Sequence, residues 1–161
     1  MEQKTAHARV EQIITEVIFE MERDKSRKFT FVEMKFLNMW YVRATQDRKD
    51  ALKKLVKEGR FEILMGGWVH TDECNAHFED IIENFVEGHQ WLSKEFGVVP
   101  RIGWNVDAFG HTQANAALFH DLGFEAFFFS RGGKDDIDDR FKSDVHGSHF
   151  LWRPLSKHFG A

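Results

Sequence analysis

Short apolar segments alternate with amphipathic helical segments along this chain, and this alternation constrains the fold more than any other feature. The predicted strands are short runs of aromatic and aliphatic residues at 29–34, 60–64, 101–106 and 124–129. The predicted helices have apolar residues at helical spacing and cover 7–23, 46–58, 75–96 and 113–122. Because strands that alternate with helices pair in parallel through right-handed crossovers, the sequence predicts an α/β domain of the layered or barrel type.

The C-terminal part of the chain departs from this alternation. Residues 132–149 are mostly polar and predict a loop, and the acidic run 135–139 lacks the glycine and glutamate that a calcium-binding loop requires. The segment Phe150–Trp152 predicts a last short strand. A length of 161 residues is typical of one domain, so we expect residues 1–161 to belong to a single domain.

Composition excludes several classes of function. The net charge of -4 and the pI of about 6.1 argue against nucleic acid as the main partner. Cys74 is the single cysteine, so an internal disulfide is impossible. No run approaches the roughly 18 apolar residues that a membrane span needs. The first residues lack the apolar core of a secretory signal, so any targeting segment is expected to lie outside this chain.

Polar residues directly follow two of the predicted strands. In parallel α/β folds, ligands bind at the carboxyl ends of strands, and this rule selects four segments: 34–36, 66–68, 107–109 and 130–131. Asp107 and Arg131 are the chemically capable pair among them and are expected to meet at one sheet edge. The alternative for Arg131 is an ordinary surface arginine at a strand end. A carboxylate such as Asp107 serves as a metal ligand, a nucleophile or a general base, or as a helix N-cap. Thr112 is the better candidate for the cap.

Three further features have both a functional and a structural interpretation: His111, the segment 70–77 and Trp68. His111 follows Asp107 by four residues and would share a metal with it if the turn were helical; otherwise it is a hydrogen-bonded core histidine. The segment 70–77 holds two histidines, an aspartate and a cysteine, as a zinc site would. However, its acidic residues also suit the N-terminus of the long helix that follows. Trp68 either stacks on a sugar or fills the core.

The segment Gly103–Thr112, GWNVDAFGHT, resembles the nucleophile motif of family 38 glycoside hydrolases, the zinc-dependent α-mannosidases. The pattern in that family is approximately Trp-x-x-Asp-Pro-Phe-Gly-His-Ser. Four other segments resemble family motifs in the same order: Glu33–Phe36, Gly66–Val69 with Asp72-Glu73, Gly123–Arg131 and Phe150–Pro154. The resemblance therefore covers nearly the whole chain, and it is closest to the lysosomal type.

The resemblance implies a fold, an activity and a set of site residues. The fold would be a distorted, seven-stranded parallel β/α barrel, the N-terminal catalytic domain of such enzymes, incomplete at both ends. Asp107 would be both the nucleophile and a ligand of Zn²⁺, and it would form a covalent glycosyl-enzyme with a terminal α-mannoside that water releases with retained configuration. Arg131 would favour the charged form of Asp107, and Phe109 would lie against the sugar.

The resemblance also implies partners and a location. The substrate would be a mannose-containing oligosaccharide or N-glycan, hydrolysed in mannose metabolism. The parent protein would belong to the lysosome, the vacuole or the secretory pathway. Nucleic acid is not expected as a partner, and no membrane-spanning segment is expected in this chain.

The chain departs from the family pattern in two ways. Ala108 stands where the family usually has proline. The family's His-x-Asp-x-Gly-Trp zinc motif is expected upstream of Met1, and its remaining histidine ligand and acid/base aspartate beyond Ala161. The His-x-Asp at 70–72 falls inside another matched motif. Because a catalytic zinc site has about three protein ligands, we expect an isolated fragment that neither holds zinc tightly nor turns over substrate.

Two other functions remain open from the residues. One is another metal-dependent carbohydrate hydrolase, similar to a polysaccharide deacetylase, with Asp107, His111 and His77 as ligands. The other is a non-catalytic degenerate copy that binds mannose or a partner whether or not metal is present.

Overall fold

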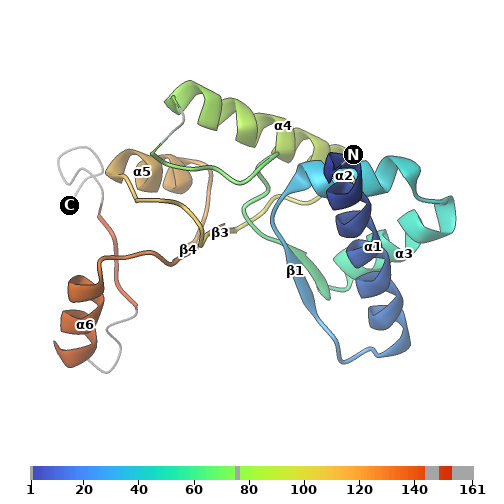
Figure 1. Cartoon of the computed structure of the whole chain (residues 1–161), viewed down its shortest axis with the longest axis horizontal. Coiled ribbons are helices and arrows are strands. Elements are labelled where there is room, and N and C mark those ends of the chain that lie inside the picture. The colour runs from blue at the N-terminus through green and yellow to red at the C-terminus, as the bar shows by residue number, and fades with distance from the viewer. Residues whose placement is uncertain (1, 75–76, 144–148, 154–161) are drawn as a thin grey trace. The chain divides into compact units, whose positions relative to one another are not determined.

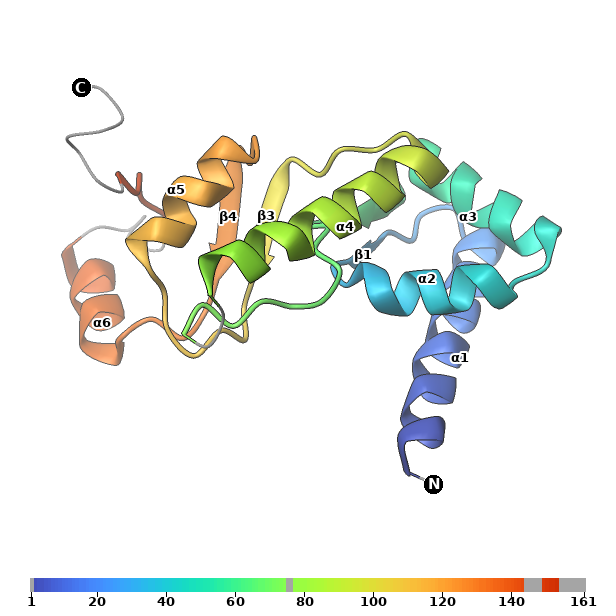
Figure 2. The same cartoon turned by 90° about the horizontal axis from the view of Figure 1, so that it is seen from above.

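The computed structural model of the protein describes residues 2–74, 77–143 and 149–153. The chain divides into two compact units. The first consists of Met1–His70 and Phe78–Pro100, and the second of Thr71–His77 and Arg101–Ala161. Figures 1 and 2 show the elements of each unit in chain order. No helix in the described ranges is long and apolar enough to cross a membrane.

The first unit is a small parallel sheet surrounded by helices. Its elements are α1 (Glu2–Arg23), β1 (Phe29–Phe31), α2 (Met34–Arg43), α3 (Gln46–Lys57), β2 (Phe61–Ile63) and α4 (Phe78–Phe96). The two strands pair in parallel, with Phe29 opposite Phe61. The core is formed by buried apolar residues from all four helices and β2, including Ile18, Leu37, Leu52, Phe61, Ile63 and Leu92, and the partly buried Phe29 and Phe31 of β1 pack against it. This burial of apolar surface is what stabilises the unit.

The second unit repeats the same strand–helix–strand design. Its elements are β3 (Ile102–Asn105), α5 (Gln113–Asp121), β4 (Ala126–Phe129) and α6 (Lys134–Ser143). The strands pair in parallel from Ile102 opposite Ala126 to Asn105 opposite Phe129. Helix α5 covers one face of the pair, where the Phe119 ring lies 5.0 Å from the Phe127 ring, centroid to centroid. Thr112 caps this helix by accepting a hydrogen bond from the Asn115 backbone, as predicted.

The alternation of helices and strands is confirmed, and so is parallel pairing. The four strands predicted between residues 29 and 129 and the four predicted helices are present, with ends shifted by up to five residues. The first residues of the helix predicted over 75–96 lie outside the described residues. In the described part of the chain the strands form two separate two-stranded sheets, so mixed α/β architecture is established. Closure of such strands into a barrel stays a prediction.

Three predictions about local structure are wrong. The strand predicted over 29–34 ends at Phe31, and an additional helix, α2, begins at Met34. Residues 134–143, predicted to be a loop, form α6, in which acidic residues come early and Arg140 and Lys142 lie in the last turn. Residues 150–152 form no strand. Instead, the rings of Phe150 and Trp152 pack against the Phe129 ring, at centroid distances of 5.9 and 6.3 Å.

A glycine in α4 permits the backbone of the Gly66–Trp68 segment to lie directly against the helix. A Cβ atom at Gly88 would stand 1.9 Å from the carbonyl oxygen of Gly66 and 2.9 Å from the backbone nitrogen of Trp68. The segment is also held by the Trp68 N–H, which donates to the Asn84 carbonyl at 2.9 Å. Because these neighbours are backbone atoms, they cannot rotate away from an added methyl group.

Gly88→Ala is therefore expected to destabilise the protein by about 1–2 kcal/mol net, because overpacking a dense interior costs up to about 3 kcal/mol. Helix propensity acts in the opposite direction but favours alanine by only about 1 kcal/mol. Chemical denaturation of both proteins measures the difference. Gly133→Ala is the matched control, because a Cβ there meets nothing within 4 Å. Equal stability of the Gly88→Ala variant and the wild type would contradict the packing argument.

Candidate active site

The register of the β3–β4 pair brings Asp107 and Arg131 together. The last paired residues are Asn105 and Phe129, and each of the two charged residues follows two positions later. The Ser130 hydroxyl donates to the Val106 carbonyl, which extends the same register by one step. The sheet edge therefore places these two residues opposite each other, as predicted from the strand-end rule.

Arg131 binds one oxygen of the Asp107 carboxylate. Its Nε donates to Asp107 Oδ1 at 3.0 Å, and its Nη2 contacts the same oxygen. The Asp107 side chain remains 68% exposed, and its hydrogen bonds to Arg131 both go to Oδ1. Arg131 has a φ of 56°, which lies in the left-handed region and is disfavoured for a residue with a Cβ. Such strain persists where surrounding contacts fix a residue and is concentrated at functional sites.

Phe109 completes this cluster. The Arg131 guanidinium carbon lies 4.4 Å from the centroid of the Phe109 ring, which is the geometry of a cation–π contact. Phe109 itself is 65% exposed, so the outer part of its surface is available to a ligand. The structure thus brings together the three residues that the sequence selected: Asp107, Arg131 and Phe109. Their chemical roles stay predictions.

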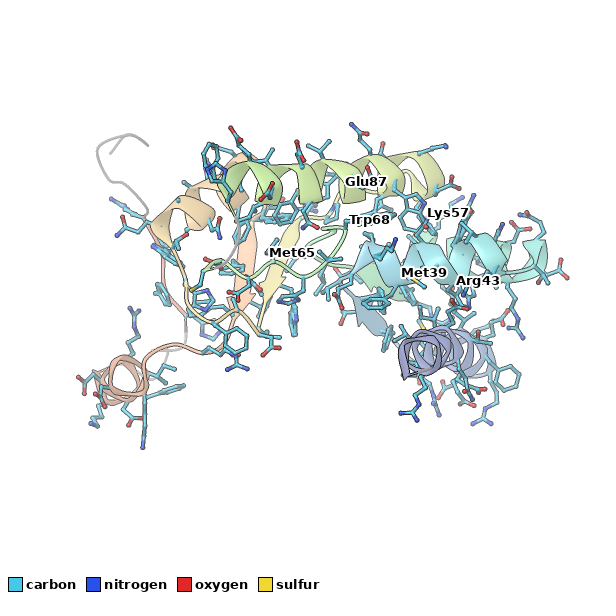
Figure 3. All side chains as sticks on the ribbon, turned by 45° about the horizontal axis from the view of Figure 1, so that its top comes forward. Met39, Arg43, Lys57, Met65, Trp68 and Glu87 are labelled. Atoms are coloured by element: carbon cyan, nitrogen blue, oxygen red, sulfur yellow. The ribbon has the colours of Figure 1, made fainter. Side chains whose placement is uncertain are left out.

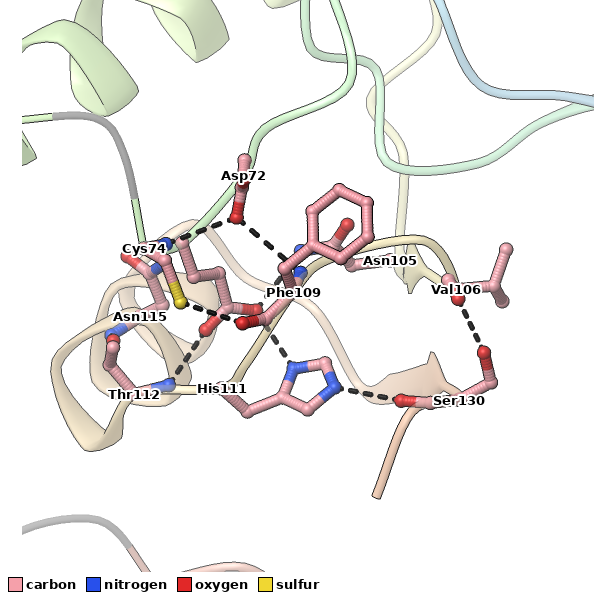
Figure 4. Close-up of polar contacts among 10 residues, drawn as sticks. Asp72, Cys74, Asn105, Val106, Phe109, His111, Thr112, Asn115 and Ser130 are labelled. Atoms are coloured by element: carbon pink, nitrogen blue, oxygen red, sulfur yellow. Dashed lines mark hydrogen bonds and ion pairs between the residues drawn. The ribbon is translucent and has the colours of Figure 1, made fainter. Parts of the chain in front are cut away.

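Glu73 is the centre of a buried polar network that sequence reasoning missed. Figure 4 labels its partners Asn105, His111 and Thr112. The Glu73 side chain is only 1% exposed. Its Oε1 accepts a hydrogen bond from Asn105 Nδ2 at 3.0 Å, and its Oε2 accepts one from the Thr112 N–H at 2.8 Å. The sequence predicted that Glu73 serves the N-terminus of the helix that follows it. Its hydrogen bonds instead go to Asn105 at the end of β3 and to Thr112, the N-cap of α5. The partners lie 32 to 39 residues further along the chain, so no local pattern reveals them.

His111 uses both of its ring nitrogens within this network. Nε2 lies 2.9 Å from the Ser130 carbonyl oxygen, and Nδ1 lies 3.1 Å from Glu73 Oε1. A carbonyl oxygen can only accept, so Nε2 carries a hydrogen and donates to Ser130, and Nδ1 lies within hydrogen-bonding distance of the Glu73 carboxyl group. The turn between Asp107 and His111 is not helical. His111 is therefore a hydrogen-bonded histidine, and neither of its nitrogens is directed toward a metal shared with Asp107.

The segment after Trp68 also serves structural contacts. Asp72 Oδ1 accepts from the Cys74 N–H at 3.2 Å and from the Phe109 N–H at 3.4 Å. The Cys74 thiol donates to the Phe109 carbonyl at 2.9 Å. These contacts, drawn in Figure 4, tie this segment to the chain around Asp107. The cysteine and aspartate of the predicted zinc-like group are thus engaged with the backbone.

The donor atoms available for a metal are few in the described ranges. Residues 2–74, 77–143 and 149–153 contain no group of three His, Cys, Asp or Glu side chains arranged to hold a metal ion. Asp107 nevertheless offers an exposed carboxylate oxygen, which is a suitable zinc ligand. These residues fit one ligand of a metal site and do not form a complete one.

Trp68 is partly buried and packs against the core of the first unit. Its ring lies edge-on to the Trp91 ring at 6.4 Å, and Lys35 Nζ lies 5.6 Å from its centroid. Figure 3 shows Trp68 beside α4. Of its two predicted roles, the structure supports core packing.

Comparison with known proteins identifies the family of this chain. Residues 1–158 match the family described as the glycosyl hydrolases family 38 N-terminal domain. The chain is 38% identical to α-mannosidase from Canavalia ensiformis over 154 residues, which is 94% of this chain and 15% of that protein. It is 37% identical to lysosomal α-mannosidase from Mus musculus over 138 residues, 84% of this chain and 14% of that protein. The chain thus spans about one seventh of these relatives.

A solved structure shares the fold. The crystal structure of an α-mannosidase from Enterococcus faecalis V583 superposes with a TM-score of 0.67 at 21% identity, covering 81% of this chain and 15% of that chain. The match over nearly the whole sequence and the identity to several α-mannosidases lead to one conclusion. This chain belongs to family 38 of the glycosyl hydrolases, as part of the N-terminal domain.

Proposed function

We propose that the protein is a retaining, zinc-dependent α-mannosidase that removes terminal α-mannose from oligosaccharides or N-glycans. The observation that carries this proposal is the cluster of Asp107, Arg131 and Phe109 at the carboxyl ends of two paired parallel strands. An exposed carboxylate fixed by an arginine beside an aromatic ring suits attack on a sugar. Family membership supplies the substrate class, since the relatives are named as α-mannosidases.

Asp107 is the nucleophile in this proposal. Arg131 holds its Oδ1, which leaves Oδ2 exposed to attack the anomeric carbon as the bond to the leaving oxygen breaks. Water then cleaves the ester between Asp107 and the sugar, so two inversions give net retention. The outward face of Phe109 offers apolar contact to the sugar ring. The acid/base carboxylate is assigned to residues outside this chain.

Zinc would enter this scheme through Asp107, which would be one of its ligands. A bound zinc ion acts as a Lewis acid and a template that orients the sugar's hydroxyl groups. The further ligands are assigned to parts of the enzyme beyond these residues. On this view the isolated chain is a piece of one catalytic domain, a distorted β/α barrel, and lacks activity by itself.

The location of the parent protein is proposed from its relatives. Lysosomal α-mannosidases from Mus musculus and Dictyostelium discoideum are each 37% identical to this chain. A lysosomal or vacuolar protein, or one of the secretory pathway, is therefore the expected setting.

The geometry of His111 disfavours the deacetylase-like alternative. That alternative needs His111 as a metal ligand, yet its ring nitrogens face Glu73 and Ser130. A ligand role would break both contacts and leave the buried Glu73 carboxylate without one of its partners, which is costly.

The proposal is tested with the full-length protein on 4-nitrophenyl α-mannoside, with the α-glucoside and β-mannoside as controls. Hydrolysis confined to the α-mannoside is expected, and proton NMR of the first product should show α-mannose before it mutarotates. Removal of metal with a chelator should abolish turnover, and added Zn²⁺ should restore it. First release of β-mannose, or release of acetate from an acetylated sugar with no glycosidase activity, would overturn the proposal.

A further inference from the structure

We propose that Glu73 is a positioning residue that fixes the loop carrying Asp107, and that its buried carboxylate does so by binding the chain on both sides of the nucleophile. This inference rests on the proposed role of Asp107. It concerns a residue in a different loop, which makes no contact with Asp107 in the described structure.

The contacts of Glu73 enclose the loop. Asn105, whose Nδ2 donates to Oε1, lies two residues before Asp107 and is itself fully buried. Thr112, whose N–H donates to Oε2, lies five residues after it. One carboxylate thus joins the last residue of β3 to the N-cap of α5 and closes the intervening loop into a ring. The loop between these points needs such support, because it has neither helix nor strand.

His111 extends the same restraint to β4. The imidazole joins Glu73 Oε1 to the Ser130 carbonyl, and Ser130 directly precedes Arg131. The loop bearing Asp107 and the strand end bearing Arg131 are therefore both connected to one buried carboxylate. Hydrogen bonds to a charged, desolvated acceptor are shorter and stronger than neutral ones, so this connection resists local opening.

The residues beside Glu73 add weaker contacts to the same loop. Asp72 accepts from the Phe109 N–H, and Cys74 donates to the Phe109 carbonyl. Gly110 allows this close approach, since a Cβ there would stand 2.7 Å from Cys74 Sγ. Three consecutive residues thus support the loop, but Glu73 is the one that is buried and bound at both ends.

The test compares Glu73→Gln with the wild-type full-length protein. Glutamine keeps the shape but removes the negative charge and one of the two acceptor oxygens, so the charge-assisted hydrogen bonds that join the two sides of the loop are weakened. We expect kcat per active site to fall by about 30- to 100-fold, the order that a misplacement of about 1 Å causes, with KM within about twofold. Active sites are counted by covalent trapping with a fluorinated α-mannosyl fluoride. Glu125→Gln, an exposed carboxylate bound to Arg101, is the control with unchanged kcat.

Hydrogen–deuterium exchange gives a second readout that needs no activity. Amides of residues 106–112 should exchange at least about 10-fold faster in Glu73→Gln than in the wild type, while amides of β2 keep their rates. Glu73→Asp, which keeps the charge but is too short to reach both sides, should show the same local loosening. This variant decides the question if Glu73→Gln does not fold.

Failure of this inference is distinguishable from failure of the proposed function. Unchanged exchange at 106–112, or unchanged kcat per trapped site with fewer sites, would overturn the positioning role and leave the α-mannosidase proposal standing. If the wild type hydrolyses no α-mannoside, the proposed function fails, and the exchange experiment still decides whether Glu73 holds the loop.

Discussion

An Asp107→Ala variant of the full-length protein is expected to hydrolyse an aryl α-mannoside at least about 10³-fold more slowly than the wild type. Removing a nucleophile eliminates the covalent route, and losses of this order or larger are typical when one member of a catalytic group is deleted. The side chain is 68% exposed and lies on a loop, so its truncation should leave thermal unfolding nearly unchanged. Steady-state kinetics and a melting curve on the same preparation measure both effects.

Azide provides a direct chemical check of the nucleophile. In the space left by the Asp107 side chain, azide should attack an activated α-mannosyl fluoride once and give β-mannosyl azide, the inverted product. Asp121→Ala is the matched control, because Asp121 is an exposed aspartate of the same unit that contacts His120. Wild-type kcat in the Asp107→Ala variant would show that the nucleophile lies elsewhere.

Arg131→Lys is expected to reduce kcat by about 10²-fold, the next largest effect. Lysine retains the positive charge, but it lacks the planar guanidinium that reaches Asp107 Oδ1 through two nitrogens and lies against the Phe109 ring. Both Asp107 and Phe109 would therefore lose a fixed neighbour, and misorientation of a reacting group costs rate steeply. Steady-state kinetics on the aryl α-mannoside provide the measurement.

Two further variants, one at Arg101 and one at Arg131, separate the catalytic effect of Arg131 from its effect on stability. Arg101→Lys changes an arginine that also binds a carboxylate, that of Glu125, and should leave kcat unchanged. Arg131→Gly removes the side chain but relieves the left-handed backbone, whose cost is of the order of 1 kcal/mol. It should therefore lose activity without losing thermal stability. Full activity in either Arg131 variant would remove this residue from the proposed site.

The strands and the strand-end pair were predictable because their signals are local. The apolar runs at 101–106 and 124–129 mark buried strands, and parallel pairing of neighbours places the residues after them at one edge. The position of Asp107 and Arg131 at one edge of the sheet was predictable from that rule. The motif around Asp107 identified the family, which the match over residues 1–158 confirmed.

The missed helices show where local signals conflict. Helix α2 directly follows a short strand, and its N-cap residue Glu33 makes no capping hydrogen bond with its side chain, so no start signal separates the two. The signal for this helix was the spacing of its buried residues Met34, Leu37 and Tyr41, which is helical. Helix α6 was obscured by its acidic run, which suits a helix start as well as a loop.

The Glu73 network was beyond prediction for a different reason. Its three partners, Asn105, His111 and Thr112, are distant in sequence and only the fold brings them to Glu73. In the sequence, a glutamate before a long helix is already explained as a helix N-terminal residue. A carboxylate buried to 1% exposure is costly unless it is fully bound, and burial cannot be read from one residue.

The β3–β4 register has a consequence for how this part of the protein tolerates insertions and deletions. Asp107 and Arg131 meet because each follows its own strand by the same number of residues, whatever the length of the chain that connects the strands. The connection through the turn after α5 can therefore vary in length among homologous proteins without separating the pair. A single residue gained or lost between Ala126 and Arg131 would instead place Ser130 or Gly132 opposite the nucleophile.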